Sequence, residues 1–248
     1  MQFLAIIPAR YASSRFPGKP LAEIDGRPMI RRVYERVNRL FSHCYVATDD
    51  LRIEEVVKNF GGRVVMTSEK HRSGTDRCGE ALEKIETETG IRFDVVVNIQ
   101  GDEPFVSEEH LTRIKEPFAL PGTQIATLVK AFSPSEDIFN PNSPKTVVSA
   151  TGFALYFSRS AIPHLRGEEQ SQWQTRFKYY KHIGMYAYRT DILREIVRLP
   201  AGVLEQAESL EQLRWLENGY TIRVAETMTE TVAIDTPEDL QRVLDLLK

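Results

Sequence analysis

The sequence predicts an α/β fold built on a Rossmann-like, mixed and mainly parallel sheet flanked by helices. Short apolar runs rich in branched residues, which are typical of buried strands, alternate with helical stretches through residues 1–100. The resulting β-α-β-α-β-α-β order favours a parallel sheet, because parallel strands need crossover connections. Ligands of such sheets bind at the carboxyl ends of the strands, so the loops at that edge are the candidate site.

Four apolar runs in the first half are too short for helices and are predicted as strands, at residues 3–7, 44–47, 64–66 and 95–99. A helix is predicted directly after Pro28, because proline is tolerated in a first helical turn. Its apolar face consists of Met29, Ile30, Val33, Val37 and Leu40. Residues 51–60 and 76–88 show weaker stripes and are predicted as two further helices.

The second half is more mixed, with strands predicted at residues 124–130, 146–149, 153–157, 182–188 and 221–225. The polar segment 164–178 lacks a clean period and is expected to form a mobile loop or an arm against a partner chain. A final helix is predicted after Thr236, which can serve as the N-cap ahead of Pro237 and two early carboxylates. Because no linker or repeat interrupts the chain, we expect one domain over residues 1–248.

Composition and charge exclude several classes of protein. With 248 residues, 42% of them hydrophobic and 27% charged, the chain resembles an average globular protein. A net charge of −3 gives no global attraction to nucleic acid or to an anionic membrane. We expect a cytoplasmic protein, because the sequence has neither a membrane-spanning apolar stretch nor an amino-terminal secretion signal. Cys44 and Cys78 are isolated, which argues against a disulfide framework or a zinc site.

The loop after the first predicted strand concentrates positive charge, since Arg10, Arg15 and Lys19 lie within ten residues. Cations, hydroxyls and backbone N–H groups at this edge of the sheet are suited to phosphates. A solvated basic loop is the alternative interpretation. A P-loop is excluded because Pro20 follows Gly18-Lys19 where Ser or Thr is needed, and no G-x-G-x-x-G motif follows any predicted strand.

Two carboxylates are candidates for a metal site. Asp102 follows the apolar run 95–99, and Asp235 lies between a strand-like segment and the N-cap of the last helix. Such a pair could hold Mg²⁺, which binds few protein carboxylates and completes its shell with phosphate and water. Turn chemistry could equally explain Asp102, and helix capping Asp235. We assign no role to Glu103.

The first loop also resembles the nucleotide-binding signature of the sugar nucleotidyltransferases, in the pattern Ile-Pro-Ala-Arg-x-x-Ser-x-Arg-x-Pro-x-Lys-Pro-Leu. Six further blocks are similar to the cytidylyltransferases that activate the acidic sugar 3-deoxy-D-manno-octulosonate (Kdo). They lie at residues 71–77, 98–104, 154–159, 181–186, 210–214 and 232–240. The resemblance covers essentially the whole chain and implies the fold of the nucleotide-diphospho-sugar transferases.

The resemblance implies that CMP passes from CTP to the anomeric hydroxyl of Kdo, releasing pyrophosphate, for lipopolysaccharide synthesis. It implies Mg²⁺ as cofactor, held by Asp102 and Asp235, and catalysis by these two residues with Arg10, Arg15 and Lys19. The nucleotide would contact Arg10, Ser14, Arg15, Lys19, Ser73, Gly74, Arg77 and Asp102. A homodimer is also implied, with a dimerisation or sugar-binding subregion around residues 130–190.

The same resemblance places a second set of residues around the sugar: Gln100, Arg159, Arg166, His182, Tyr186, Glu211 and Gln212. We do not assign His182 as a general base, because deprotonation through a metal is favoured. Tyr186 could instead be a core residue, and Glu211 and Gln212 could form an exposed helical turn. The aromatic stretch 173–180 could be a dimer interface or part of the core.

Three rival functions remain open. The acceptor could be another acidic sugar, such as an amino-substituted Kdo or a sialate. A glycosyltransferase is less favoured, because its Asp-x-Asp metal motif is replaced here by Asp102-Glu103-Pro104. A nucleotide-sensing module without turnover would keep the first loop but would have no reason to keep both Asp102 and Asp235.

Overall fold

The computed structural model describes residues 1–12, 16–230, 234 and 236–246, and the chain forms two compact units. Unit 1 contains Met1–Thr112, Tyr188–Val197 and Thr231–Lys248, and unit 2 contains Arg113–Ala187 and Arg198–Glu230. The chain therefore passes from one unit to the other four times. Because each unit is built from separate stretches, no linker marks a boundary in the sequence.

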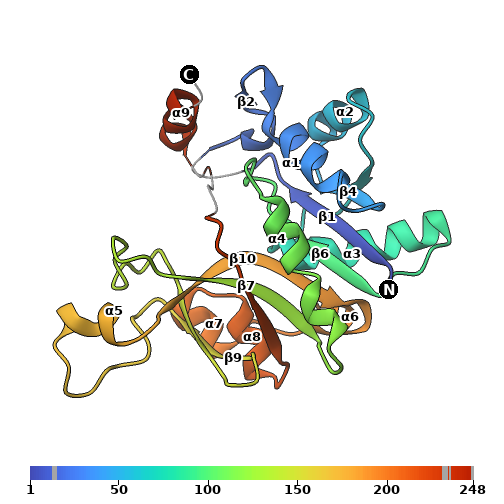
Figure 1. The fold of residues 1–248 in the computed structure, drawn as a ribbon. Helices are drawn as coiled ribbons and strands as arrows, with labels where there is room; N and C mark the ends of the chain where they lie inside the picture. Colours follow the sequence, from blue (N-terminus) through green and yellow to red (C-terminus); the bar gives the residue numbers. More distant parts are fainter. Residues whose placement is uncertain (13–15, 231–233, 235, 247–248) are drawn as a thin grey trace. The chain divides into compact units, whose positions relative to one another are not determined.

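Unit 1 contains a four-stranded parallel sheet in the order β6-β1-β4-β5. Three helices connect successive strands and pack against this sheet (Figure 1). The strands are β1 (Phe3–Ala9), β4 (Cys44–Thr48), β5 (Val64–Met66) and β6 (Val95–Asn98), and the helices are α1 (Met29–Asn38), α2 (Leu51–Asn59) and α3 (Gly74–Thr89). The predicted α/β fold with a mainly parallel sheet is confirmed.

The core of unit 1 follows the predicted apolar pattern. Residues 4–7 of β1 and 95–97 of β6 are fully buried, as expected for strands covered on both faces. On α1, Met29, Ile30, Val33 and Val37 form the buried stripe. Leu40 was expected to extend that stripe, but it lies beyond the end of the helix at Asn38 and is only half-buried.

Shorter elements complete unit 1: η1 (Lys19–Leu21), β2 (Glu23–Ile24), β3 (Arg27–Pro28), α4 (Glu108–Arg113, whose last residue counts with unit 2), α6 (Thr190–Ile196) and α9 (Pro237–Leu246). The predicted cap of the last helix is confirmed. The Asp239 N–H donates to the Thr236 hydroxyl at 3.2 Å, and the Thr236 N–H donates to the Asp239 carboxylate at 3.0 Å. This reciprocal pair satisfies N–H groups that the helix leaves open.

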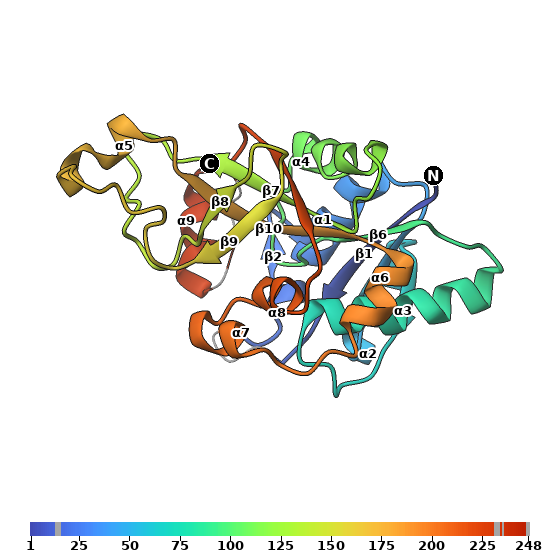
Figure 2. The same ribbon diagram turned by 90° about the horizontal axis from the view of Figure 1, so that it is seen from below.

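Unit 2 contains β7 (Ile125–Ala131), β8 (Lys145–Val148), β9 (Ala154–Ser158), β10 (Tyr180–Arg189) and β11 (Ile222–Glu226). Strand β11 runs parallel to β7, whereas β8 runs antiparallel to both β9 and β10. Its helices are η2 (Glu116–Ala119), η3 (Gln170–Gln172), α5 (Trp173–Arg176), α7 (Val203–Glu208) and α8 (Gln212–Glu217). Helix α8 packs against α7 and β9 (Figure 2).

The polar segment 164–178 contains more structure than its sequence predicts, because η3 and α5 lie within it. Trp173 is 3% exposed, donates from its indole N–H to the Glu168 carbonyl at 3.1 Å and clusters with Ile138 and Tyr179. The core interpretation therefore holds for Trp173 and Tyr179, whereas Phe177 stays exposed.

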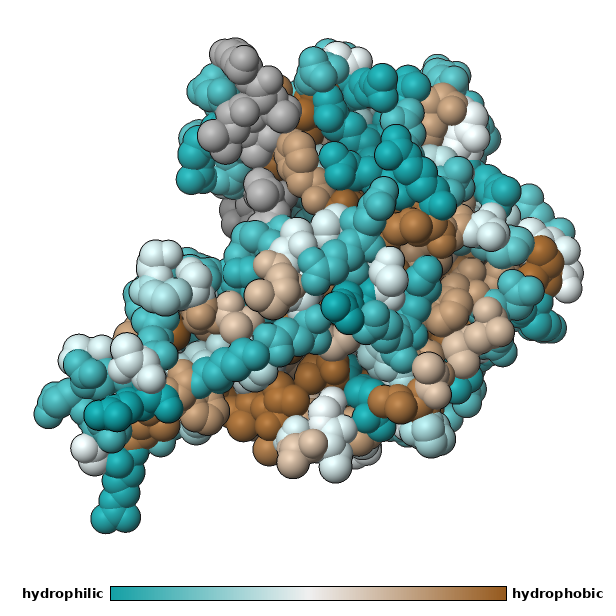
Figure 3. Space-filling view, in the orientation of Figure 1, coloured by the Kyte–Doolittle hydropathy of each residue, from teal (hydrophilic) through white to brown (hydrophobic). Residues whose placement is uncertain are grey.

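The molecular face in Figure 3 is largely hydrophilic, with apolar areas separated by polar side chains. Among the described residues, no helix is both long enough and apolar enough to cross a membrane.

Candidate active site

The carboxyl ends of β1 and β6 and the start of α3 meet closely in unit 1. A Cβ atom on Gly101 would lie 2.7 Å from the Pro8 carbonyl oxygen, and a Cβ on Gly74 would lie 3.5 Å from both Pro8 Cγ and Asn98 Nδ2. Position 101 therefore accepts only glycine without movement of the backbone. We call Pro8, Gly74, Asn98 and Gly101 the strand-end cluster.

Lys19 and Asp102 form an ion pair beside this cluster, with 2.5 Å between Nζ and Oδ2. Lys19 is placed by the short helix η1, which begins after Gly18 in a left-handed conformation (φ 74°) with its N–H bonded to the Tyr11 carbonyl at 2.9 Å. Asp102 directly follows Gly101. The structure thus brings together one predicted phosphate-binding cation and one predicted metal ligand that are 83 positions apart.

The other residues predicted in these loops are placed less completely. Arg10 is described and exposed, whereas Ser14, Arg15 and Asp235 lie outside the described residues. Ile234 precedes Asp235 in the chain and donates its N–H to the Asp102 carbonyl oxygen at 3.1 Å.

Helix α3 begins at the strand-end cluster with the predicted Ser73 and Gly74. The Ser73 hydroxyl accepts the Asp76 N–H at 3.1 Å and serves as the N-cap. The start of this 16-residue helix therefore presents open N–H groups and the positive end of the helix dipole, which favour an anion. A contact of Ser73 and Gly74 with a nucleotide phosphate stays a prediction.

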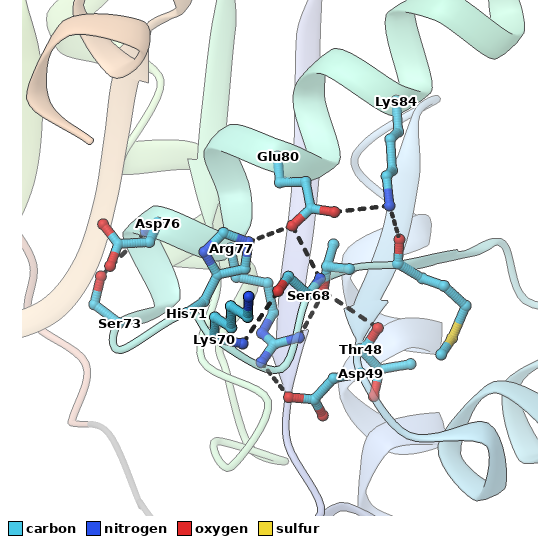
Figure 4. A network of polar contacts seen from close by, with 12 residues as sticks. Thr48, Asp49, Ser68, Lys70, His71, Ser73, Asp76, Arg77, Glu80 and Lys84 are labelled. Atoms are coloured by element: carbon cyan, nitrogen blue, oxygen red, sulfur yellow. Dashed lines mark hydrogen bonds and ion pairs between the residues drawn. The ribbon is translucent and has the colours of Figure 1, made fainter. Parts of the chain in front are cut away.

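Arg77 is 1% exposed and binds protein groups (Figure 4). Its guanidinium donates to the Asp49 carboxylate at 2.6 Å and to the Thr67 hydroxyl at 2.5 Å. In this structure Arg77 joins α3 to the loops after β4 and β5. Its predicted contact with the nucleotide stays a prediction.

A second carboxylate on α3 organises the neighbouring loop, as Figure 4 shows. Glu80 accepts the Ser68 N–H at 2.9 Å and pairs with Lys84 at 2.7 Å and with His71. Burial alone would raise the pKa of Glu80, but the hydrogen bonds from Lys84, Ser68 and His71 lower it to about 2. The loop that leads to Ser73 is therefore tied to α3 by a carboxylate that stays ionised at neutral pH.

The described residues fit Mg²⁺ only through Asp102. No group of three or more His, Cys, Asp or Glu side chains within the described ranges could enclose an ion. Mg²⁺ does not need such a cage, because it commonly binds one or two carboxylates together with substrate phosphates and water. The side chain of Asp102 is 31% exposed, so its hard oxygen atoms are accessible to an ion. The two-carboxylate site with Asp235 stays a prediction.

In unit 2, His182 lies on β10 with its ring beside those of Phe157 and Tyr186, at centroid distances of 5.1 and 5.3 Å. The Thr127 hydroxyl donates to the Met185 carbonyl at 2.8 Å, which leaves its oxygen to accept a hydrogen bond from His182 Nε2 at 3.0 Å. Although part of the residue is accessible, the surrounding protein desolvates the imidazole and lowers the pKa of His182 to about 3. A neutral ring that carries its proton on Nε2 presents Nδ1 as an acceptor for a sugar hydroxyl.

Tyr186 and Gln212 lie in the interior of unit 2. The Tyr186 ring packs edge-on against Trp215 at 5.0 Å, in agreement with the core interpretation of its ring. Gln212 is 4% exposed, and its Nε2 has no hydrogen-bond partner among the described residues. Gln212 opens α8 and is buried, so the exposed-turn interpretation is wrong for it. Its neighbour Glu211 is half-buried.

Arg159 follows β9, and its guanidinium donates to three backbone carbonyls: Glu208 at 2.7 Å, Pro141 at 2.9 Å and Ser209 at 3.2 Å. A guanidinium carries five N–H groups, and its contacts with described residues leave one on each terminal nitrogen for a ligand. Arg166 is exposed in a turn, and no contact joins it to the other predicted sugar residues among those described. Gln100 belongs to unit 1 and is half-buried after β6.

Sequence reasoning missed three residues that the structure places at these sites. Asn98 is 2% exposed and keeps its Oδ1 without a partner in the described part of the chain. Asp49 pairs with Arg77, and Lys145 lies fully buried next to Arg159. The amide of Asn98 interrupts the apolar run 95–99, so the sequence alone could have drawn attention to it. Asp49 and Lys145 become significant only through partners that are distant in the sequence.

We predict that His182 makes stability depend on pH between 6.5 and 5. The unfolded imidazole titrates near 6.5 and the folded one near 3. Below pH 6.5 the unfolded chain therefore binds a proton that the folded chain does not. The free energy of unfolding should fall by up to about 1.4 kcal/mol per pH unit, less in proportion to the partial exposure of the residue.

Urea unfolding of the wild type and of His182→Gln at pH 7.5 and 5.0 checks this prediction. The substitution should flatten the loss of stability, whereas His164→Gln, at an exposed histidine of the same unit, should not. Glu80 does not interfere, because its contribution is lost only below about pH 4.5. Equal slopes for the wild type and His182→Gln would contradict the assignment.

The chain matches the cytidylyltransferase family over residues 4–232. It is 58% identical over 251 residues to the 3-deoxy-manno-octulosonate cytidylyltransferase of Parabacteroides distasonis, and the match covers 100% of this chain and 98% of that protein. The enzyme of the same name from Phocaeicola vulgatus is 59% identical over 251 residues, with the same coverage of both chains.

Two solved structures are also similar to this chain. A CMP:2-keto-3-deoxy-manno-octonic acid synthetase complexed with CTP matches with a TM-score of 0.89 and 42% identity, covering 100% of this chain and 98% of that one. The 4-diphosphocytidyl-2C-methyl-D-erythritol synthase of Anaerococcus prevotii, at 13% identity and a TM-score of 0.59 over 99% of this chain and 98% of that one, shares the fold. The chain therefore belongs to the cytidylyltransferase family, among its 3-deoxy-manno-octulosonate cytidylyltransferases.

Proposed function

We propose that this protein transfers CMP from CTP to the anomeric hydroxyl of Kdo, forming CMP-Kdo and releasing pyrophosphate. The observation that carries the proposal is the Lys19–Asp102 pair beside the start of α3, in a chain that shares 58% of its residues with a Kdo cytidylyltransferase. A cation, a carboxylate and open helix N–H groups at one strand end supply what a metal-bound triphosphate requires.

In the proposed reaction the anomeric oxygen forms a bond to the α-phosphorus while the bond from that phosphorus to the bridging oxygen of pyrophosphate breaks. The hydroxyl proton leaves to solvent, and no covalent enzyme intermediate is needed. Lys19 would stabilise negative charge on the phosphates as pyrophosphate departs, with Arg10 and Arg15 as further cations. Mg²⁺, held by Asp102 and Asp235, would supply Lewis-acid stabilisation of that charge and acidify the attacking hydroxyl.

The proposal assigns the sugar mainly to residues of unit 2. Arg159 has N–H groups suited to the sugar carboxylate, and His182 Nδ1 can accept a hydrogen bond from a hydroxyl. The buried Nε2 of Gln212 is a donor without a partner among the described residues, so an acceptor on the sugar would satisfy it. The remaining assigned contacts are Gln100, Arg166, Tyr186 and Glu211.

Pyrophosphate release tests this function. Purified protein is mixed with CTP and Mg²⁺ and with Kdo, 8-amino-8-deoxy-Kdo or sialate, and phosphate is measured after pyrophosphatase treatment. We expect release that depends on Kdo and Mg²⁺. Faster release with another sugar would identify that sugar as the substrate. Tight CTP binding without release from any sugar would indicate a nucleotide sensor.

Lys19→Met should raise the KM for CTP and lower kcat, because it removes the charge that contacts phosphate while keeping the volume of the side chain. We expect kcat/KM for CTP to fall about a hundredfold. Arg27→Met provides the control, since Arg27 is an exposed cation of the same unit that pairs with Glu35. Steady-state kinetics that are unchanged in Lys19→Met would refute the phosphate role.

The proposal includes a homodimer that works in the cytoplasm and serves lipopolysaccharide synthesis, as the resemblance implies. Analytical ultracentrifugation of the purified chain tests the oligomeric state.

A further inference from the structure

Lys145 is a buried cation that binds backbone carbonyl groups. The residue is 0% exposed, and no carboxylate lies within ion-pair distance of its Nζ among the described residues. Its ammonium group instead donates to the carbonyls of Asn140, at 2.9 Å, and of Arg159. Burial lowers the pKa of Lys145, and the nearby charges of Asp137 and Glu208 oppose that change.

The carbonyl that Lys145 binds belongs to Arg159, whose side chain binds carbonyls in turn. The Arg159 guanidinium spans the carbonyl oxygens of Pro141, Glu208 and Ser209. Glu208 completes the arrangement, because its carboxylate accepts the Arg159 N–H at 2.9 Å and the Ser158 hydroxyl at 2.6 Å. We call the side chains of Lys145, Arg159 and Glu208 the carbonyl clamp.

The carbonyl clamp joins three segments of unit 2 that carry proposed sugar contacts or lead to them. It fixes the end of β9 at Arg159 and the turn at Ser209, whose φ of 50° is unusual for a residue with a side chain. That turn leads into Glu211 and Gln212. On its other side, Lys145 pairs in register with Lys181 of β10, and the Pro144 carbonyl accepts the His182 N–H at 2.9 Å.

Stability alone does not explain a lysine at this position. A buried charge bears a large desolvation penalty, which the two hydrogen bonds to carbonyl groups have to offset. What an apolar side chain cannot do is hold two carbonyl groups in fixed directions. The ammonium group of Lys145 therefore serves to fix the directions of these two carbonyl groups.

We propose that Lys145 and Glu208 are positioning residues of the sugar site, which hold Arg159 and the turn before Glu211 and Gln212 in the geometry that binds Kdo. The inference rests on the proposed function and adds to it two residues that touch no substrate. It requires that their loss weakens the sugar interaction and leaves the nucleotide interaction of unit 1 unchanged.

Steady-state kinetics of Lys145→Met test this inference. The KM for Kdo should rise about ten- to a hundredfold, because small displacements of binding groups have effects of that size, while the KM for CTP stays within about twofold of wild type. Lys130→Met is the matched control, because Lys130 lies in the same unit and pairs with Glu230 at 3.2 Å, and neither residue belongs to the carbonyl clamp. It should leave both KM values unchanged.

Glu208→Ala and Glu208→Gln give a second test at a half-buried position, where the fold is expected to survive. Alanine removes both acceptor oxygens and should raise the KM for Kdo. Glutamine keeps one acceptor oxygen and should restore much of the wild-type KM for Kdo. A purely structural role, as judged by the melting temperature, would not require this recovery of KM.

The outcomes separate the two claims. If the wild type releases no pyrophosphate with Kdo, the proposed function fails. If the wild type is active and these variants change neither KM, or change both equally, the positioning role fails and the function stands. A rise in the KM for Kdo in Lys130→Met as large as that in Lys145→Met would also overturn the positioning role.

Discussion

Asp102→Asn should abolish turnover while the fold persists. The substitution keeps the shape of the side chain but removes the charge that pairs with Lys19 and, in the proposed mechanism, binds Mg²⁺. We expect kcat to fall at least about a thousandfold. Pyrophosphate release measures the loss, and circular dichroism with thermal unfolding shows that the protein is folded.

Asp94→Asn is the matched control, because Asp94 and Asp102 lie at opposite ends of β6. Asp94 is exposed and accepts the Gln2 N–H at 2.6 Å. Its replacement should leave kcat unchanged. Asp235→Asn should have the same effect as Asp102→Asn, and substantial activity in either Asp102→Asn or Asp235→Asn would refute the metal role of that residue.

The second large effect concerns stability. Arg77→Met leaves the half-buried Asp49 carboxylate without this partner and removes a hydrogen bond to Thr67. Breaking a buried ion pair on one side costs about 3–5 kcal/mol, a large part of the stability of a typical domain. For a chain of this size the melting temperature should fall by about 6–20 °C, measured by calorimetry.

A double variant separates the structural role of Arg77 from a contact with nucleotide. Arg77→Met combined with Asp49→Asn removes both charges and should recover part of the lost stability, because the two residues are coupled. CTP affinity is then measured in the double variant at a temperature where it is folded. A melting temperature of Arg77→Met equal to that of wild type would contradict the structural role.

Local patterns predict the elements of unit 1 well. The strands at 44–48, 64–66 and 95–98 lie within one residue of their predicted limits, because each is built on a short apolar run between polar residues. Helix α3 begins two residues before the predicted position 76, since its N-cap is Ser73. The predicted strands of unit 2 are displaced by one or two residues, because half-covered strands have less distinct ends.

Tertiary packing decides what the sequence does not predict. Helices α7 and α8 have six residues each, too few for a periodic apolar stripe to stand out. The polar segment around Trp173 is ordered by contacts with Tyr179 and with Ile138, which lies 35 residues earlier in the chain. Such contacts have no counterpart in local residue patterns.

In the candidate site, too, local patterns predict some residues and tertiary packing decides the others. The first loop and Asp102 were predicted from charge at a strand end, and the structure joins Lys19 to Asp102. Lys145 and Glu208 were not predicted, because their importance lies in the groups they bind, which are two carbonyls for Lys145 and the Ser158 hydroxyl and Arg159 N–H for Glu208. A lysine at the start of a strand normally indicates a solvated edge, and only the fold shows that this one is enclosed.

Strand β10 belongs to both units, with residues 180–187 in unit 2 and 188–189 in unit 1. A recombination event that exchanges one continuous stretch of sequence between relatives therefore cannot transplant unit 2 alone, because its two stretches flank ten residues of the other unit. If His182 and Gln212 contact the sugar as proposed, changes of acceptor preference should accumulate as point substitutions around them. Chimaeras that are cut within β10 should fail to express as soluble protein.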